Sequence, residues 1–410
     1  MGLFSILLIL LVVTRVFGEL ALRLHLPALV GELVAGIVLG MLAPMFTGSL
    51  PELANLPENE VFRALTDLGV FFLMLLGGLE MRPRKLADSS GSALLVAAGG
   101  MVLPLAAGIG LGWCVLPESS HRLPQVLFLG TALAITAIPV AVKVLMDVNK
   151  LNSRVGRVIV SAAIFDDVLS LVLLALLTSL IKTGEWPGWG GIGMILLNIA
   201  IFFAVTSAIG LLLLPKAAKW IDRTRLQEFE FSVFLIVAFG FAVLAEHLGI
   251  HFVLGAFAAG LFFTRETMHN PSAFERAQKQ VSGLTTGFLA PVFFASIGLH
   301  LSSQAFVAIP GFLVLLVVIA FATKLVGAGV PALLVGLSKR DALLVGSGMS
   351  ARGAVELIIA DIALRAGLFE VPDGEHPIVH NLFSAVVIMA VVTTLLTPIA
   401  LRLILLRKKS

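Results

Sequence analysis

The 410-residue chain has the composition of a membrane protein. Hydrophobic residues make up 59% of it and charged residues only 13%, about half the share that is usual in soluble domains. The single cysteine, Cys114, excludes a disulfide framework and any site built from several thiolates. The chain is therefore predicted to be an all-α polytopic membrane protein, and we expect neither a cofactor nor a nucleic-acid partner.

Thirteen apolar segments are predicted to cross the bilayer, because a helix needs about 20 apolar residues to span the hydrocarbon core. The first is interpreted as a membrane helix and not as a signal peptide, since no basic residue precedes it. The ninth is short, and the eleventh is too long for one straight crossing. The predicted limits are 4–23, 27–46, 61–80, 91–116, 124–148, 153–182, 190–215, 228–249, 252–264, 277–300, 305–336, 340–366 and 380–405.

Basic residues are distributed unequally between the two sets of alternate loops. One set holds 20 lysines and arginines, and the other holds only Arg63, Arg122, Lys182 and Arg365. Cytoplasmic loops collect Lys and Arg in membrane proteins. The pattern therefore predicts an inner (plasma) membrane protein whose N-terminus lies outside and whose C-terminus lies in the cytoplasm.

The two halves of the chain resemble each other. Leu29–Ile37 resembles Val253–Leu261 at an offset of 224 residues, and Gly78–Met81 resembles Gly298–Leu301 at 220. Each span of the first half thus matches the span seven places later in the chain. Because consecutive spans cross the membrane in opposite directions, an odd separation gives the two copies opposite orientations. Such inverted repeats of six helices are typical of secondary transporters. The first repeat, the linker helix and the second repeat are predicted at 4–182, 190–215 and 228–405.

Two spans at corresponding positions of the repeats contain helix-breaking residues. Pro139 in the fifth span lacks an N–H and clashes with the preceding turn of a helix. Gly346–Gly353 interrupts the twelfth span at the matching depth. Unwound backbone survives in a bilayer only where protein or water satisfies it, and its carbonyls can then bind an ion. A simple proline kink would explain the fifth span alone, but it would not explain the pair.

Two adjacent carboxylates, Asp166 and Asp167, lie near the middle of the sixth span. Each costs about 2.5–3.5 kcal/mol to insert, so we expect both to face protein or water and to form the working site. Successive helical residues point about 100° apart, which predicts different partners for the two. Lys324 in the eleventh span is expected beside one of them, because an unpaired buried ammonium is costly. A purely structural pair tied to a cation is the alternative.

Other charges within the spans have partners of opposite sign at helical spacing. The expected pairs are Arg15–Glu19, Lys143–Asp147, Arg352–Glu356 and Asp361–Arg365. These pairs are interpreted as structural, except that Arg352 borders the broken segment and can offset the dipole at the C-terminal end of a half-helix. Glu32 either lines the ion path or meets Arg15.

Together these motifs resemble the monovalent cation:proton antiporter-2 family, sodium/proton antiporter type. The stretches that carry the resemblance are Ala134–Leu145, Phe165–Val168 and Gly348–Leu357, the last being similar to the family's RG-x-x-E-L segment. The likeness extends over essentially the whole chain. It implies a thirteen-helix homodimer with two crossed discontinuous helices in a core domain, at about 91–182 and 305–405, and a dimer domain made of the remaining helices.

The resemblance also implies roles for individual residues. Asp167 is expected to take the cation or the proton, so that it would be a metal ligand together with Asp166. Asp166 is expected to pair with Lys324, and Thr136 is assigned to the ion-binding set. The structural or coupling residues are predicted to be Lys324, Pro139, Arg352 and Glu356.

The expected function is secondary exchange of a monovalent cation, Na+ before Li+ or K+, for protons. One carboxylate site that faces the two sides in turn would hold either ion, and a second proton carried on Lys324 would make the exchange electrogenic. No phosphate-binding loop is present in the sequence, which argues against ATP-driven pumping.

Two other functions are weighed against this expectation. Potassium-efflux relatives often have an amide at the position of Asp166 and a further nucleotide-binding domain, so this chain favours Na+ over K+/H+ exchange or K+ efflux. An intramembrane aspartyl protease is a remote alternative, because its two carboxyls must converge on one water while adjacent helical residues diverge.

Overall fold

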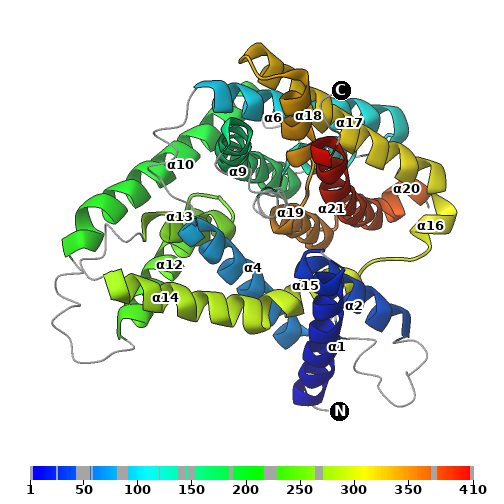
Figure 1. Cartoon of the computed structure of the whole chain (residues 1–410). Coiled ribbons are helices and arrows are strands. Elements are labelled where there is room, and N and C mark those ends of the chain that lie inside the picture. Colours follow the sequence, from blue (N-terminus) through cyan, green and yellow to red (C-terminus); the bar gives the residue numbers. More distant parts are fainter. Residues whose placement is uncertain are drawn as a thin grey trace. The chain divides into compact units, whose positions relative to one another are not determined.

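The computed structural model consists of helices throughout its regular part (Figure 1). It falls into two compact units. The first unit comprises Met1–Pro83 and Trp189–Leu301, and the second comprises Arg84–Gly188 and Ser302–Ser410. The residues described are 3–24, 26–42, 56, 59–80, 91–119, 121–136, 145, 153–183, 188–216, 229–263, 271–370 and 376–406.

Each of the thirteen predicted segments contains helix within the described ranges. The helices of the first unit are α1 (Leu3–Arg23), α2 (Ala28–Leu42), α4 (Glu60–Glu80), α10 (Gly188–Ala208) with the π-helical turn η3 (Ile209–Leu213), α12 (Phe229–His247), α13 (Phe252–Phe262), α14 (Pro271–Leu284), the π-helical turn η4 (Thr285–Leu289) and α15 (Ala290–Leu299). Those of the second unit are α6 (Gly91–Val115), α7 (Arg122–Ala134), α9 (Arg154–Thr183), α16 (Ala305–Ala308), α17 (Pro310–Leu334), α18 (Lys339–Gly348), α19 (Ala354–Arg365), α20 (Pro377–His380) and α21 (Leu382–Leu406).

Eight helices within the described ranges are long and apolar enough to cross a membrane. They are Phe4–Arg23, Glu60–Glu80, Gly91–Val115, Arg154–Leu180, Gly188–Lys216, Phe274–Leu299, Pro310–Leu334 and Leu382–Leu405. Three shorter apolar helices accompany them, at Ala28–Leu42, Phe231–His247 and Phe252–Phe262. The long predicted segment 305–336 is divided at Ile309, where α16 ends and Pro310 begins α17. The number of crossings remains a prediction.

Two helix crossings in the first unit depend on glycine. Where α2 meets α15, a Cβ atom on Gly36 or Gly298 would lie 2.2 or 2.3 Å from a backbone oxygen of the facing helix. Where α4 meets α13, a Cβ atom on Gly78 or Gly260 would lie 2.2 Å from one. Gly260 follows Gly36 by 224 residues and Gly298 follows Gly78 by 220. Exchanging the predicted repeats therefore converts one crossing into the other, which supports the inverted repeat.

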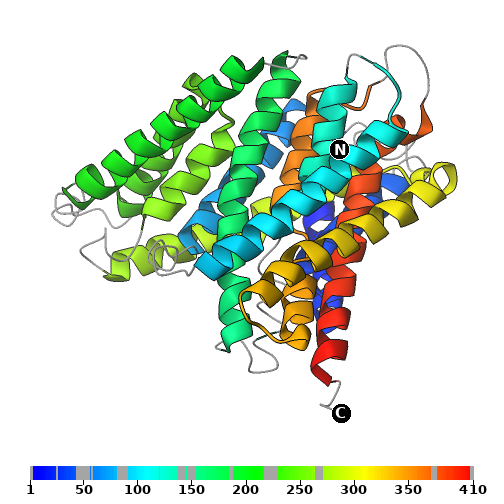
Figure 2. The same ribbon diagram turned by 90° about the horizontal axis from the view of Figure 1, so that it is seen from above.

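A third glycine crossing lies in the second unit, where α6 and α17 run side by side (Figure 1 and Figure 2). A Cβ atom on Gly99 would lie 2.4 Å from the oxygen of Gly327, and one on Gly327 would lie 2.6 Å from the oxygen of Gly99. The contact is thus self-complementary. It also holds Lys324, which is one turn before Gly327, in the interior of the unit.

The charges of α1 correct one predicted pair. Arg15 Nη1 lies 3.5 Å from Glu32 Oε1, whereas Glu19 bonds Arg23 at 3.1 Å. The Arg15–Glu19 pair was therefore wrong, and the alternative in which Glu32 meets Arg15 is confirmed.

Arg15 also donates to the carbonyl of Thr286 in η4. In a π-helical turn this carbonyl would accept from residue 291, but Pro291 has no N–H. The guanidinium therefore supplies the donor that the helix lacks. Because the contact joins residues 271 positions apart, it is tertiary and leaves no signal at helical spacing.

The glycine crossings lead to a prediction about stability. Gly298→Ala should lower the free energy of unfolding by about 1–3 kcal/mol, because α15 and α2 must move apart to admit the methyl group. Gly77→Ala is the matched control, since a Cβ atom there meets nothing within 4 Å. Thermal unfolding of the purified protein in detergent measures both variants. Equal midpoints for the two would contradict the assigned role of the crossing.

Candidate functional site

The middle of α9 carries the adjacent aspartates. Asp166 is fully buried, and its Oδ1 lies 3.4 Å from Nζ of Lys324, which is also fully buried. The expectation that Lys324 lies beside one of the aspartates is therefore confirmed. Asp167 lies in the same helix, but its side chain is outside the described part of the structure. The assignment of Asp167 as the residue that binds the transported ion stays a prediction.

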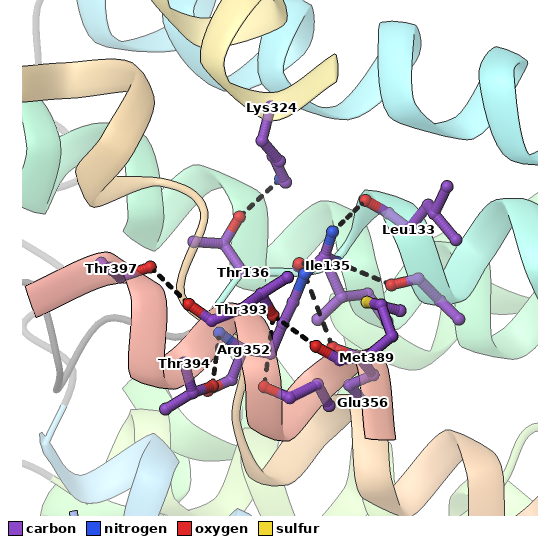
Figure 3. A network of polar contacts seen from close by, with 12 residues as sticks. Leu133, Ile135, Thr136, Lys324, Arg352, Glu356, Met389, Thr393, Thr394 and Thr397 are labelled. Atoms are coloured by element: carbon purple, nitrogen blue, oxygen red, sulfur yellow. Dashed lines mark hydrogen bonds and ion pairs between the residues drawn. The ribbon is translucent and has the colours of Figure 1, made fainter. Parts of the chain in front are cut away.

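Lys324 has a second partner in the segment that follows α7. Its ammonium donates to Thr136 Oγ1 at 2.5 Å (Figure 3). Thr136 is itself buried. One cation therefore joins α17 to α9 through Asp166 and to the end of α7 through Thr136. A fully buried ammonium requires such partners, since desolvation alone would make its charge costly.

The predicted span 124–148 is not one continuous helix. Helix α7 ends at Ala134, and Ile135 is extended, with φ −74° and ψ 149°. A proline ring in a helix clashes with the carbonyl four residues earlier, which for Pro139 is that of Ile135. The break thus begins where this clash is expected. Pro139 itself lies outside the described residues, so its role stays a prediction.

Arg352 binds the carbonyl groups at the end of α7. Its Nη1 donates to the oxygens of Ala132, at 2.6 Å, and Ile135, and its Nη2 donates to that of Leu133 at 2.7 Å (Figure 3). These carbonyls lie where a helix has no further N–H to offer. The positive guanidinium also faces the negative end of the helix dipole. Arg352 therefore meets the end of a half-helix, as its place beside the twelfth-span break indicated.

The second break separates α18 from α19. Helix α18 ends at Gly348 and α19 begins at Ala354, so the interruption predicted within Gly346–Gly353 is confirmed in the later part of that stretch. The N–H of Arg352 donates to Thr394 Oγ1 at 3.2 Å, and the same hydroxyl donates to the carbonyl of Arg352 at 3.0 Å (Figure 3). One hydroxyl of α21 thus replaces both helical partners of an unwound residue.

The sequence did not single out Thr394. Threonine in an apolar helix usually bonds to its own backbone, as Thr393 and Thr397 do here. A threonine at this place in the sequence therefore does not indicate that its hydroxyl bonds to another segment. Its spacing to Arg352, 42 positions along the chain, offers no local signal either.

Glu356 accompanies Arg352 at the start of α19. Both are fully buried, and Arg352 Nε lies 3.7 Å from Glu356 Oε2, which confirms the predicted pair. Neither carboxylate oxygen of Glu356 accepts a hydrogen bond from the described residues. The Asp361–Arg365 pair is confirmed at 2.8 Å, whereas Lys143–Asp147 lies outside the described ranges.

The candidate site therefore combines carboxylate, hydroxyl, ammonium and guanidinium groups from five segments of the second unit. No group of three or more His, Cys, Asp or Glu side chains that could hold a metal ion occurs among the residues described. The predicted site residues that the structure brings together are Thr136, Asp166, Lys324, Arg352 and Glu356.

This arrangement occurs in a chain whose residues 6–407 match the model of the sodium/hydrogen exchanger transmembrane family. The chain belongs to this family. The predicted antiporter resemblance is thereby confirmed, and the family is one of transporters and not of enzymes, which sets the intramembrane protease aside.

Three of the proteins that this family member resembles are antiporters from bacteria. The chain is 33% identical over 396 residues to the Na+/H+-K+ antiporter GerN of Bacillus cereus, which covers 96% of this chain and 94% of that protein. It is 31% identical over 423 residues to the high-affinity Na+/H+ antiporter NhaS3 of Synechocystis sp., covering 95% and 87%. A Na+/H+ antiporter of Enterococcus hirae is 26% identical over 398 residues, covering 97% of each.

A solved structure has the same fold. The sodium proton antiporter MjNhaP1 from Methanocaldococcus jannaschii superposes with a TM-score of 0.69 and 17% sequence identity, covering 98% of each chain. The likeness extends over both compact units, and it confirms the predicted fold class.

The contacts of Arg352 predict a large effect of its removal. Arg352→Gln should lower the free energy of unfolding by about 3–5 kcal/mol, because it leaves a buried carboxylate unpaired and three carbonyls without a donor. Arg23→Gln is the control, since the side chains of Arg23 and its partner Glu19 are 73% and 58% exposed, and loss of this pair should change stability by about 1 kcal/mol or less. Thermal unfolding in detergent compares them. A similar small shift in both variants would contradict the role given to Arg352.

Proposed function

We propose that this chain is a secondary antiporter that exchanges a monovalent cation, Na+ in the first place, for protons. Family membership supports this class of reaction, and relatives that match nearly the whole chain are named Na+/H+ antiporters. At the level of residues, the observation that carries the proposal is the fully buried Asp166–Lys324 pair beside the ends of two broken helices.

The charge balance of the second unit supports one ion at a time. Asp166 and Glu356 are offset by Lys324 and Arg352, so these four groups sum to zero when all are ionised. Asp167 then adds one negative charge. A net charge is costly in a bilayer, so we assign Asp167 to bind either one monovalent cation or one proton. Competition between the two, at a site that opens to each side in turn, couples the fluxes.

The membrane setting completes the proposal. We assign the second unit, which contains all the candidate residues, to the core domain and the first unit to the dimer domain of a homodimer in the plasma membrane. The distribution of basic residues supports an external N-terminus and a cytoplasmic C-terminus.

Potassium is the second candidate cation. The specific observation in its favour is that the relative GerN is named a Na+/H+-K+ antiporter. Carboxylate and hydroxyl oxygens bind either alkali ion, and the choice between them depends on cavity size and on the number of ligands.

A transport assay tests the proposal. Protein in liposomes that contain a pH-sensitive dye is challenged in turn with Na+, Li+ and K+. Na+ should drive proton movement in the wild type, and the apparent KM for Na+ should rise as pH falls, by up to about tenfold per unit, because protons compete for the same carboxylate. Asp167→Asn should abolish the response, since an amide cannot alternate between proton-bearing and ion-bearing forms.

Glu118→Gln is the control for this assay, because the Glu118 side chain is 95% exposed at the end of α6. Exchange by Asp167→Asn at the wild-type rate would remove Asp167 from the site. A KM that stays constant over several pH units would contradict direct competition.

The Asp166–Lys324 pair leads to a prediction about charge movement. We propose that Lys324 carries a second proton when the cation is absent, so that more than one proton crosses per cation. Each charge moved responds to membrane potential by about 2.3 kcal/mol per 100 mV. The wild-type rate should therefore depend on potential. Lys324→Gln combined with Asp166→Asn should keep some exchange and lose much of this dependence, because the pair is removed as a unit.

The measurement uses proteoliposomes clamped at different potentials with valinomycin and K+, after K+ transport has been excluded. A wild-type rate that is the same at every potential would overturn the electrogenic proposal while leaving exchange itself intact.

A further inference from the structure

Ser170 in α9 is a buried hydroxyl that has no ordinary partner. Its side chain is fully buried, and Oγ makes no hydrogen bond with any described residue. Six other buried hydroxyls donate to the carbonyl four residues earlier, which is the default in an apolar helix. They are Thr14, Thr178, Thr206, Ser350, Thr393 and Thr397. Ser170 differs from these six, because its hydroxyl does not donate to the carbonyl of Asp166.

The neighbouring turn of α9 presents a second unpartnered oxygen. Asp166 Oδ1 faces Lys324, but Asp166 Oδ2 accepts no hydrogen bond within the described part of the chain. Residues four apart on a helix are neighbours, with about 5–6 Å between their Cβ atoms. The hydroxyl of Ser170 and the free carboxylate oxygen therefore lie on one face of α9 without bonding each other. A ligand that both oxygens can bind would satisfy them together.

The register of the helix relates Ser170 to both aspartates. At 100° per residue, position 170 lies about 40° from position 166 and about 60° from position 167 around the helix axis. It thus stands between the two acidic positions, one turn further along.

We propose that Ser170 Oγ is a ligand of the transported cation, which it binds together with Asp166 Oδ2 and Asp167. The inference rests on the proposed function and adds a ligand to its site. A carboxylate oxygen only accepts, and a hydroxyl can turn its lone pairs toward the same point, so the two oxygens can bind one cation together. Alkali ions favour hard oxygen ligands of this kind.

Substitution of Ser170 tests the proposal. Ser170→Ala should raise the apparent KM for Na+ about tenfold and change the maximal rate by less than about twofold, since one neutral ligand is lost and the aspartates remain. Ser170→Thr keeps the hydroxyl and should stay within about threefold of the wild-type KM. Thr178→Val is the control two turns further on α9, because its hydroxyl is already bonded to Leu174. It should leave KM unchanged.

Direct binding separates this inference from the proposed function. Na+-dependent thermal stabilisation of the purified protein in detergent needs no proton exchange. A wild type that binds Na+ more tightly than Ser170→Ala but moves no protons would support the ligand and overturn the antiporter. Exchange in the wild type with the same KM and the same stabilisation in Ser170→Ala and Thr178→Val would overturn the ligand alone, and would leave the hydroxyl to a water.

A second variant covers the case in which Ser170→Ala does not fold. Ser170→Cys keeps a similar volume but offers sulfur, which is a poor ligand for a hard cation. It should show the same loss of Na+ affinity. A wild-type affinity in Ser170→Cys would overturn the assignment.

Discussion

Arg352 holds the ends of two interrupted helices, and the geometry of the candidate site depends on this contact. Its guanidinium binds the carbonyls that close α7, while its own backbone is satisfied by Thr394. Unwound backbone in a bilayer is tolerated only when each polar group has a protein or water partner. Arg352 thus meets this requirement at the end of α7, and Thr394 meets it for Arg352 itself in the second break. Movement of α7 away from this position would require the buried guanidinium of Arg352 to find other hydrogen-bond acceptors.

Lys324 connects this framework to the acidic helix. Its ammonium is shared between Thr136, which follows the end of α7, and Asp166 of α9. A cation bound near Asp166 would repel the ammonium and weaken this bond, whereas a proton on Asp166 would remove its attraction. In either case the change reaches the broken end of α7 through a single side chain. The site and the discontinuous helix are therefore electrostatically linked without any intervening element.

The cost of buried charge explains which features the sequence could predict. The Asp166–Lys324 and Arg352–Glu356 pairs were predictable because an unpaired charge in lipid is so unfavourable that a partner is required. The contact of Arg15 with Glu32 was predicted only as one of two alternatives, since it spans two helices and replaces a nearer carboxylate. The hydroxyl of Thr394 was missed because serine and threonine can satisfy themselves locally. Side chains of that kind gain their role only from the three-dimensional packing.

The self-complementary contact of Gly99 with Gly327 relates the two halves of the chain to each other, and it shows that the halves carry different charges. When the two repeats are aligned so that Gly99 corresponds to Gly327, Val96 corresponds to Lys324. Val96 is equally buried but neutral. The first repeat thus contributes Asp166 of α9, and the second contributes the lysine that pairs with it. Either half alone would bury its member of this pair, Asp166 or Lys324, without the partner. The two repeats are thus alike in backbone but differ in sequence at this position, because a chain with two identical halves would bury a second ammonium at position 96 in the same helix crossing.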